Sequence, residues 1–64
     1  MDEYTELDLE IIRITDSAIL FTDGDKEEVW ISKSLIGNLD DDWEEGDTEL
    51  IAIPIWLAEK EGLV

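Results

Sequence analysis

The chain has 64 residues, 44% of them hydrophobic, and its 19 Asp and Glu against 4 Lys and Arg give a formal net charge of −15. This length makes one small domain, residues 1–64, and the apolar content, which includes three tryptophans, distinguishes it from disordered acidic tails. The charge excludes nucleic acid and anionic membranes as direct partners, because both bind proteins through Lys and Arg. A soluble monomer that binds basic surfaces is the expectation that remains.

The first predicted element is a half-buried strand over residues 6–11, in which apolar and acidic side chains alternate strictly. The pair Ile11-Ile12 breaks this alternation, and Ile12 and Ile14 carry the apolar positions onward. This change of phase predicts a bulge or a sharp twist near this point, either of which leaves Arg13 facing solvent.

A turn at residues 16–17 leads into a second predicted strand over residues 18–22, and residues 23–25, Asp-Gly-Asp, carry the turn chemistry of a hairpin. The return strand is predicted over residues 27–32. Its alternation leaves two alternatives for Trp30, which either closes one end of the core or lies exposed beside acidic residues.

Residues 33–47 are the least regular part of the chain. Leu35, Leu39 and Trp43 recur at a helical spacing, but Gly37-Asn38 interrupts it, which predicts one or two separate helical turns within a loop.

The C-terminal part predicts a buried strand over residues 50–53, ended by Pro54, and then a short helix over residues 55–61. Gly62 stands where a left-handed cap is expected, with Leu63 placed to fold back on the helix. The predicted fold class is α+β: a small antiparallel sheet of three or four strands that could curl toward a barrel, short helical turns and a C-terminal helix.

Catalysis and metal binding both lack their usual residues. The chain has no histidine and no cysteine, so the common general base, thiol nucleophile and soft metal ligands are missing. A calcium loop that starts at Asp40 would place Glu45 where glycine is required and Ile51 where the bidentate glutamate is required. We therefore expect no enzyme, no cofactor and no dedicated metal site.

Acidic residues gather in three regions that we take as candidate partner-binding surface. Successive acids on the first strand stand about 6.7 Å apart, which resembles the step between phosphates of a nucleic-acid strand. The ordinary alternative is the solvated face of an amphipathic strand, but a surface selected only for solubility mixes both signs. The candidates are Glu6, Asp8 and Glu10; Asp23, Asp25, Glu27 and Glu28; and Asp40, Asp41, Asp42, Glu44, Glu45 and Asp47.

Trp43, with acids on both sides, completes the candidate list. It either plugs the core under its loop or anchors the centre of a charged interface, since tryptophan is enriched in binding hot spots. Trp30 and Trp56 are expected in the core, because each lies in a regular element beside apolar residues.

Two segments, Glu28 to Ile36 and Ile53 to Leu63, resemble small proteins carried by phages and mobile elements, with Ser32 in place of a proline and Ile55 in place of an acidic residue. Together with the charge, this resembles the acidic anti-CRISPR and anti-restriction proteins. The resemblance implies an inhibitor that occupies the DNA-binding groove of a host defence protein as a DNA mimic.

The leading functional hypothesis is therefore a stoichiometric inhibitor that blocks the basic nucleic-acid-binding groove of a partner such as a CRISPR effector subunit. The alternatives are a small acidic adaptor or structural subunit for another basic protein, and a carboxylate-based divalent-cation binder. Because the sequence opens Met1-Asp2-Glu3 without a secretory signal and has no long apolar run, we expect a cytoplasmic location in the host cell.

Overall fold

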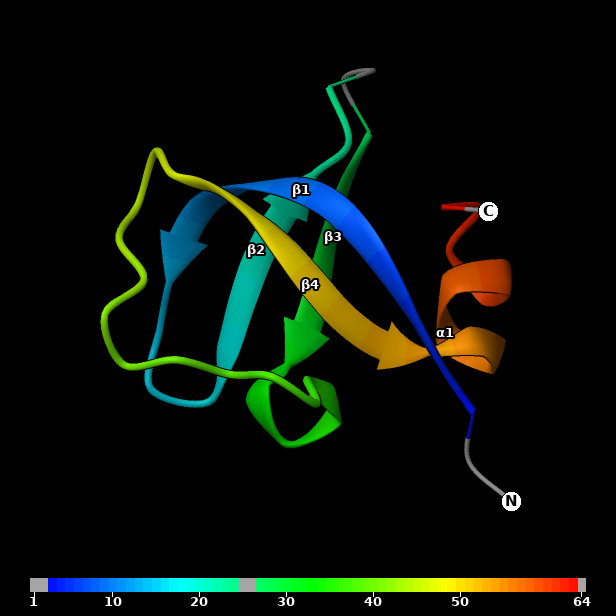
Figure 1. Cartoon of the computed structure of the whole chain (residues 1–64). Helices are drawn as coiled ribbons and strands as arrows, with labels where there is room; N and C mark the ends of the chain where they lie inside the picture. The colour runs from blue at the N-terminus through cyan, green and yellow to red at the C-terminus, as the bar shows by residue number, and fades with distance from the viewer. Residues whose placement is uncertain (1–2, 25–26, 64) are drawn as a thin grey trace.

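The computed structural model describes residues 3–24 and 27–63. Four strands, a single 3₁₀ turn and one short helix make up this part of the chain (Figure 1). In order they are β1 (Tyr4–Ile14), β2 (Ala18–Thr22), β3 (Glu28–Ser32), the 3₁₀ turn Lys33–Leu35, β4 (Thr48–Pro54) and α1 (Ile55–Lys60).

The strands form one antiparallel sheet in the order β3-β2-β1-β4. The long strand β1 serves both halves: its residues 4–10 pair with β4, and its residues 10–14 pair with β2. The sheet curls, but β3 and β4 stay at opposite edges, so it is not closed into a barrel. The α+β class and the antiparallel sheet are confirmed.

The predicted bulge is present in β1. The register with β2 shifts between Ile11 and Arg13, so Ile12 is the extra residue. As a result Ile11 pairs with Phe21, and Arg13, which pairs with Leu20, is exposed. The bulge allows β1 to bend from one half of the sheet to the other, because a bulged strand bends and twists locally.

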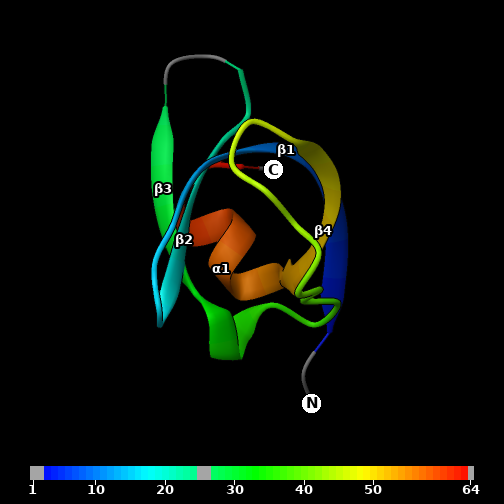
Figure 2. The same cartoon turned by 90° about the vertical axis from the view of Figure 1, so that its left-hand side faces the viewer.

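The core lies on the concave side of the sheet and is capped by α1. Alternate residues of every strand are buried there, among them Leu9, Ile11, Phe21, Ile31 and Ile53. The helix adds Leu57 and Ala58. Figure 2 shows α1 in the space between the β2–β3 half and the β4 side of the sheet.

Two expectations about burial are wrong. Trp30 and Trp56 are not in the core, since 51% and 52% of their surfaces are exposed. The predicted buried strand at 50–53 begins earlier, at Thr48, and Leu50 points outward with 45% of its surface exposed. The reason is the same period of two that buries Ile51 and Ile53: in a strand with only one covered face, every second residue faces solvent.

The C-terminal cap is formed as predicted, although α1 ends at Lys60, one residue before the predicted end. Gly62 has a φ of 74°, and its N–H donates to the Glu59 carbonyl at 3.2 Å. The Leu63 N–H donates to the Ala58 carbonyl at 2.8 Å, which completes a Schellman motif and brings Leu63 against the core.

The loop between the 3₁₀ turn and β4 protects the outer edge of β4. The Asn38 side chain donates to the Leu50 carbonyl at 2.7 Å and accepts from the Ala52 N–H at 2.9 Å. The Gly37 N–H donates to the Ala52 carbonyl at 2.7 Å. Residues 37 and 38 thereby satisfy backbone groups that an edge strand would otherwise offer to another chain.

Candidate partner-binding surface

The acidic side chains of β1 form a row on the convex side of the sheet, away from the core. Glu6, Asp8 and Glu10 are all exposed, while Leu9 between them is buried. We call these three residues the β1 acid row. Because they occupy alternate positions of one strand, they follow one another along β1 in steps of about 6.7 Å.

No opposite charge lies directly across from the β1 acid row. On β4 its three members face Ala52, Leu50 and Thr48, and on β2 Glu10 also faces Thr22. Cross-strand neighbours are the closest positions at which Lys or Arg could neutralise a strand carboxylate. The uncharged residues at these positions leave the three carboxylates without an opposite charge across the strands, and Arg13 is the next residue of β1 on the same face, beyond the bulge.

The loop acids are a second exposed group, and the structure gives two of them structural roles. Asp40, Asp41, Asp42, Glu44 and Glu45 are exposed, whereas Asp47 is half-buried. The Asp40 carboxylate accepts a hydrogen bond from the Asp42 N–H at 2.9 Å, which fixes a turn. The Glu45 carboxylate accepts from the Ile14 N–H at 3.0 Å and ties the loop to β1.

Backbone pairing brings the end of this loop against the bulge of β1. The Ile11 N–H donates to the Asp47 carbonyl at 2.8 Å, and the Gly46 N–H donates to the Ile11 carbonyl at 2.7 Å. Gly46 has a φ of 95°, a conformation that residues with side chains rarely adopt. These two hydrogen bonds hold the end of the loop next to Glu10, the last member of the β1 acid row.

The third predicted group lies at the β2–β3 hairpin. Asp23, Glu27 and Glu28 are exposed, and Asp25 lies outside the described residues. Gly24 has a φ of 95°, as the predicted turn requires. Glu28 faces Thr22, which in turn faces Glu10, so this group joins the β1 acid row across the sheet.

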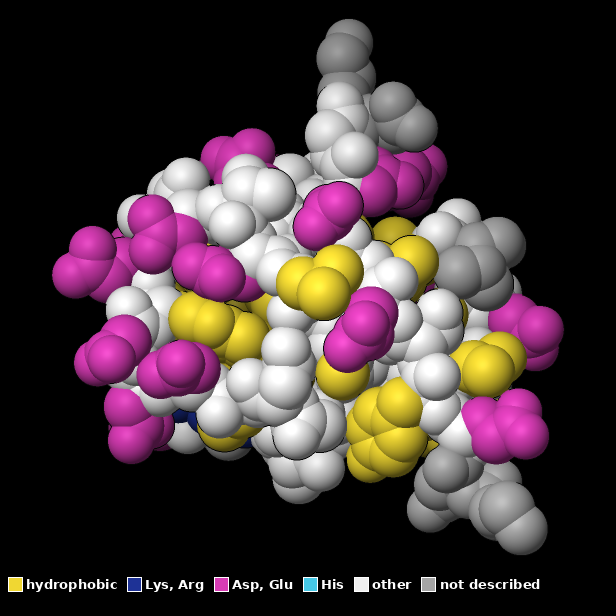
Figure 3. Space-filling model, in the orientation of Figure 1, with side chains coloured by type: hydrophobic (Ala, Val, Ile, Leu, Met, Phe, Trp, Pro, Cys, Tyr) yellow, Lys and Arg dark blue, Asp and Glu magenta, His cyan; other side chains and the backbone are white. Residues whose placement is uncertain are grey.

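Figure 3 shows how acidic side chains spread over one face of the molecule. They gather over the loop that joins β3 to β4, and others lie over β1 and β4, with exposed hydrophobic side chains between them. The exposed large hydrophobic residues of the described chain are Tyr4, Trp30, Leu39, Leu50 and Trp56. The surface therefore combines negative charge with apolar contact area.

The sequence-based candidates did not include these exposed apolar residues, although exposure beside acidic residues was one of the two alternatives given for Trp30. The signal was nevertheless present for Trp30, because it shares a strand face with Glu28. The exposure of Leu50 follows from the register of β1 and β4, because Leu50 pairs with the exposed Asp8 and so lies on the same face of the sheet.

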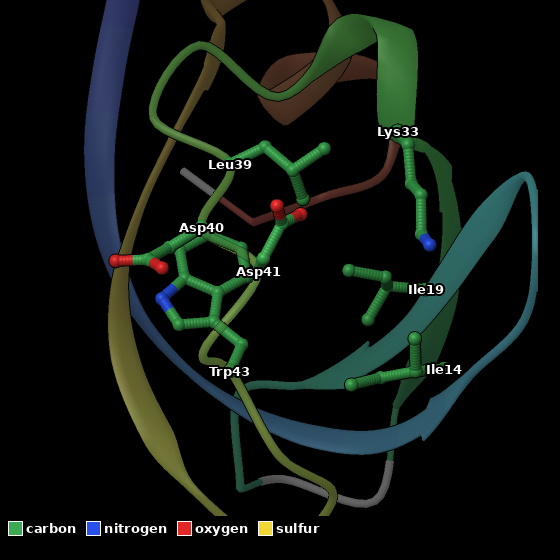
Figure 4. Close-up of a pocket in the computed structure, with 7 residues that line it drawn as sticks. All are labelled: Ile14, Ile19, Lys33, Leu39, Asp40, Asp41 and Trp43. Atoms are coloured by element: carbon green, nitrogen blue, oxygen red, sulfur yellow. The ribbon is translucent and has the colours of Figure 1, made fainter.

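Trp43 belongs to the edge of the core. Its side chain is half-buried and packs against the core cluster. Figure 4 shows Trp43 and Leu39 on one side of a small pocket, with Ile14, Ile19 and Lys33 on the other. This contact supports the alternative in which Trp43 plugs the core under its loop.

The pocket beside Trp43 is too small to serve as a substrate site. Its volume is about 90 Å³, whereas ligand pockets usually measure about 300–1,000 Å³. Asp40 and Asp41 stand at its rim, and the Asp40 carboxylate points away from it (Figure 4).

Within residues 3–24 and 27–63, no group of three or more acidic side chains is arranged to hold a metal ion. The described chain also has no helix that is long and apolar enough to cross a membrane. Comparison with protein-family models, curated proteins and solved structures gives no match to this chain.

Proposed function

We propose that this protein is a stoichiometric inhibitor that binds the Lys- and Arg-lined groove of a nucleic-acid-binding protein and acts there as a DNA mimic. The β1 acid row takes the place of successive phosphates, and the loop acids extend the negative surface beyond the end of the row. The protein performs no chemistry. It competes with nucleic acid by occupying the same basic side chains, and a CRISPR effector complex of the host is the target class that fits the sequence resemblance.

The observation that carries this proposal is the β1 acid row with its uncharged cross-strand partners. A strand selected only for solubility would gain stability from Lys or Arg opposite its acids, because opposite-charge pairs across strands contribute about 0.2–1 kcal/mol each. This chain places Ala52, Leu50 and Thr48 there instead. The arrangement keeps the carboxylates free for charges that a partner supplies.

Capture from a cell lysate tests the proposal. The bait is the tagged wild-type protein, and its row variant carries Glu6→Gln, Asp8→Asn and Glu10→Gln. A matched control variant, Glu3→Gln with Glu59→Gln and Glu61→Gln, removes the same amount of charge from exposed positions outside the row and loop. The wild type and the control should retain nucleic-acid-binding proteins that added duplex DNA releases, and the row variant should not. Retention that DNA leaves unchanged would contradict mimicry.

A further inference from the structure

Trp30 is half exposed although it lies in the middle of a strand. It belongs to β3, an outer strand of the sheet, and points to the convex side, because its neighbours Val29 and Ile31 are buried in the core. Across the sheet it faces Leu20, and Leu20 faces Arg13. Leu20, its half-buried neighbour on β2, is uncharged, and 51% of the Trp30 surface is exposed.

A carboxylate stands beside this indole. Glu28 occupies the next position on the same face of β3, about 6.7 Å along the strand, and it is exposed. The residue opposite Glu28 is Thr22, which carries no charge. Arg13 lies in the same cross-strand row as Trp30 but two strands away. The Cα atoms of the two residues are therefore about 10 Å apart.

A half-exposed indole next to an exposed carboxylate matches one side chain in particular. A guanidinium is planar, stacks on an aromatic face and can reach a carboxylate with its remaining N–H groups, whereas an ammonium is a compact point charge. We infer that Trp30 and Glu28 form a contact for an arginine side chain of the partner. This inference rests on the proposed function only in taking the partner to be basic, and it adds a contact separate from the β1 acid row.

Trp56 provides a matched control within the same chain. It is as exposed as Trp30, at 52%, but it lies in the first turn of α1. Lys60 follows four residues later, and residues four apart are neighbours on a helix surface. Trp56 therefore already has a cation of its own chain on its side of the helix, which Trp30 lacks on its strand.

The test uses octa-arginine and octa-lysine peptides, titrated into the full chain by calorimetry at about 50 mM salt, where charge interactions are weakly screened. The measured quantity is the ratio of the two dissociation constants. In the wild type, octa-arginine should bind more tightly. Trp30→Leu should reduce this preference about two- to fivefold, as loss of an exposed cation–π contact predicts. Trp56→Leu should leave the preference unchanged, and Trp30→Tyr should retain part of it.

The outcomes separate this inference from the proposed function. If both peptides bind but Trp30→Leu keeps the full arginine preference, the arginine contact is refuted while the acidic surface stands. An equal loss in Trp56→Leu would also refute it, because any exposed indole would then suffice. If neither peptide binds the wild type, the proposed function fails, and the arginine contact fails with it.

Discussion

The Glu45 carboxylate accepts a hydrogen bond from the backbone N–H of Ile14, at 3.0 Å and across 31 residues of sequence. This bond joins the acidic loop to the last residue of β1. Glu45→Ala should therefore lower the free energy of unfolding by about 0.5–1 kcal/mol, whereas Glu45→Gln, which keeps an acceptor, should lower it less. Chemical denaturation measures both.

Glu44→Ala is the control for this prediction, because Glu44 is also exposed and contributes its backbone carbonyl, not its side chain, to the turn with Asp47. Equal stability of the Glu44→Ala and Glu45→Ala variants would show that the bond to Ile14 contributes nothing.

At Gly37 the half-exposed Tyr4 ring lies close to the point where a side chain would begin. A Cβ at residue 37 would stand 2.9 Å from Cε2 of Tyr4, which is closer than real contacts allow. Gly37→Ala should lower the free energy of unfolding by about 1 kcal/mol or more, since the ring or the loop must move. In a Tyr4→Ala background the same change should cost less. Additive effects in this double-mutant cycle would contradict the contact.

Trp43 and Trp30 should differ in how much their substitution lowers stability. Trp43→Ala should lower the free energy of unfolding by about 2 kcal/mol, below the range for a fully buried aromatic residue because Trp43 is half-buried. Trp30→Ala should change stability little, since half of its side chain is already in water. Thermal melts of the two variants compare them directly, and a larger loss for Trp30→Ala would reverse the assignment.

Salt should stabilise the free protein. With 19 acidic residues against 4 basic ones, folding brings like charges together, and screening relieves that repulsion. The melting temperature should therefore rise between about 20 mM and 500 mM NaCl. A melting temperature that stays constant or falls would mean that attraction between charges outweighs repulsion in the fold.

The strands and their faces were predictable where a period of two is strict. Residues 6–11, the bulge at Ile12, the turn before β2 and the Gly62 cap all follow from local patterns. The sheet order and the register of β1 with β4 were not predictable, because they depend on pairings between distant segments. The exposure of Leu50 depends on that register.

The expected burial of Trp30 and Trp56 was wrong, whereas Trp43 is half-buried against the core. Hydrophobicity favours the core for Trp30 and Trp56, but a domain of 64 residues has room for few large side chains. Phe21 and the isoleucines of the strands fill that space. The hydrogen bond between Asn38 and the edge of β4 was also not predictable from the sequence. Gly37-Asn38 reads as an ordinary loop, and its partner Ala52 lies 14 residues further along the chain.

DNA mimicry by the β1 acid row can be measured as displacement of basic proteins from duplex DNA. Lysate proteins are bound to bead-immobilised DNA, and the wild type, the row variant and the control variant are each titrated in while the released proteins are quantified. If the β1 acid row mimics DNA, the wild type and the control should release a discrete set of DNA-binding proteins at stoichiometric concentrations, and the row variant, equally well folded, should release far less. Equal release by the row variant, or no release by the wild type, would contradict DNA mimicry by the β1 acid row.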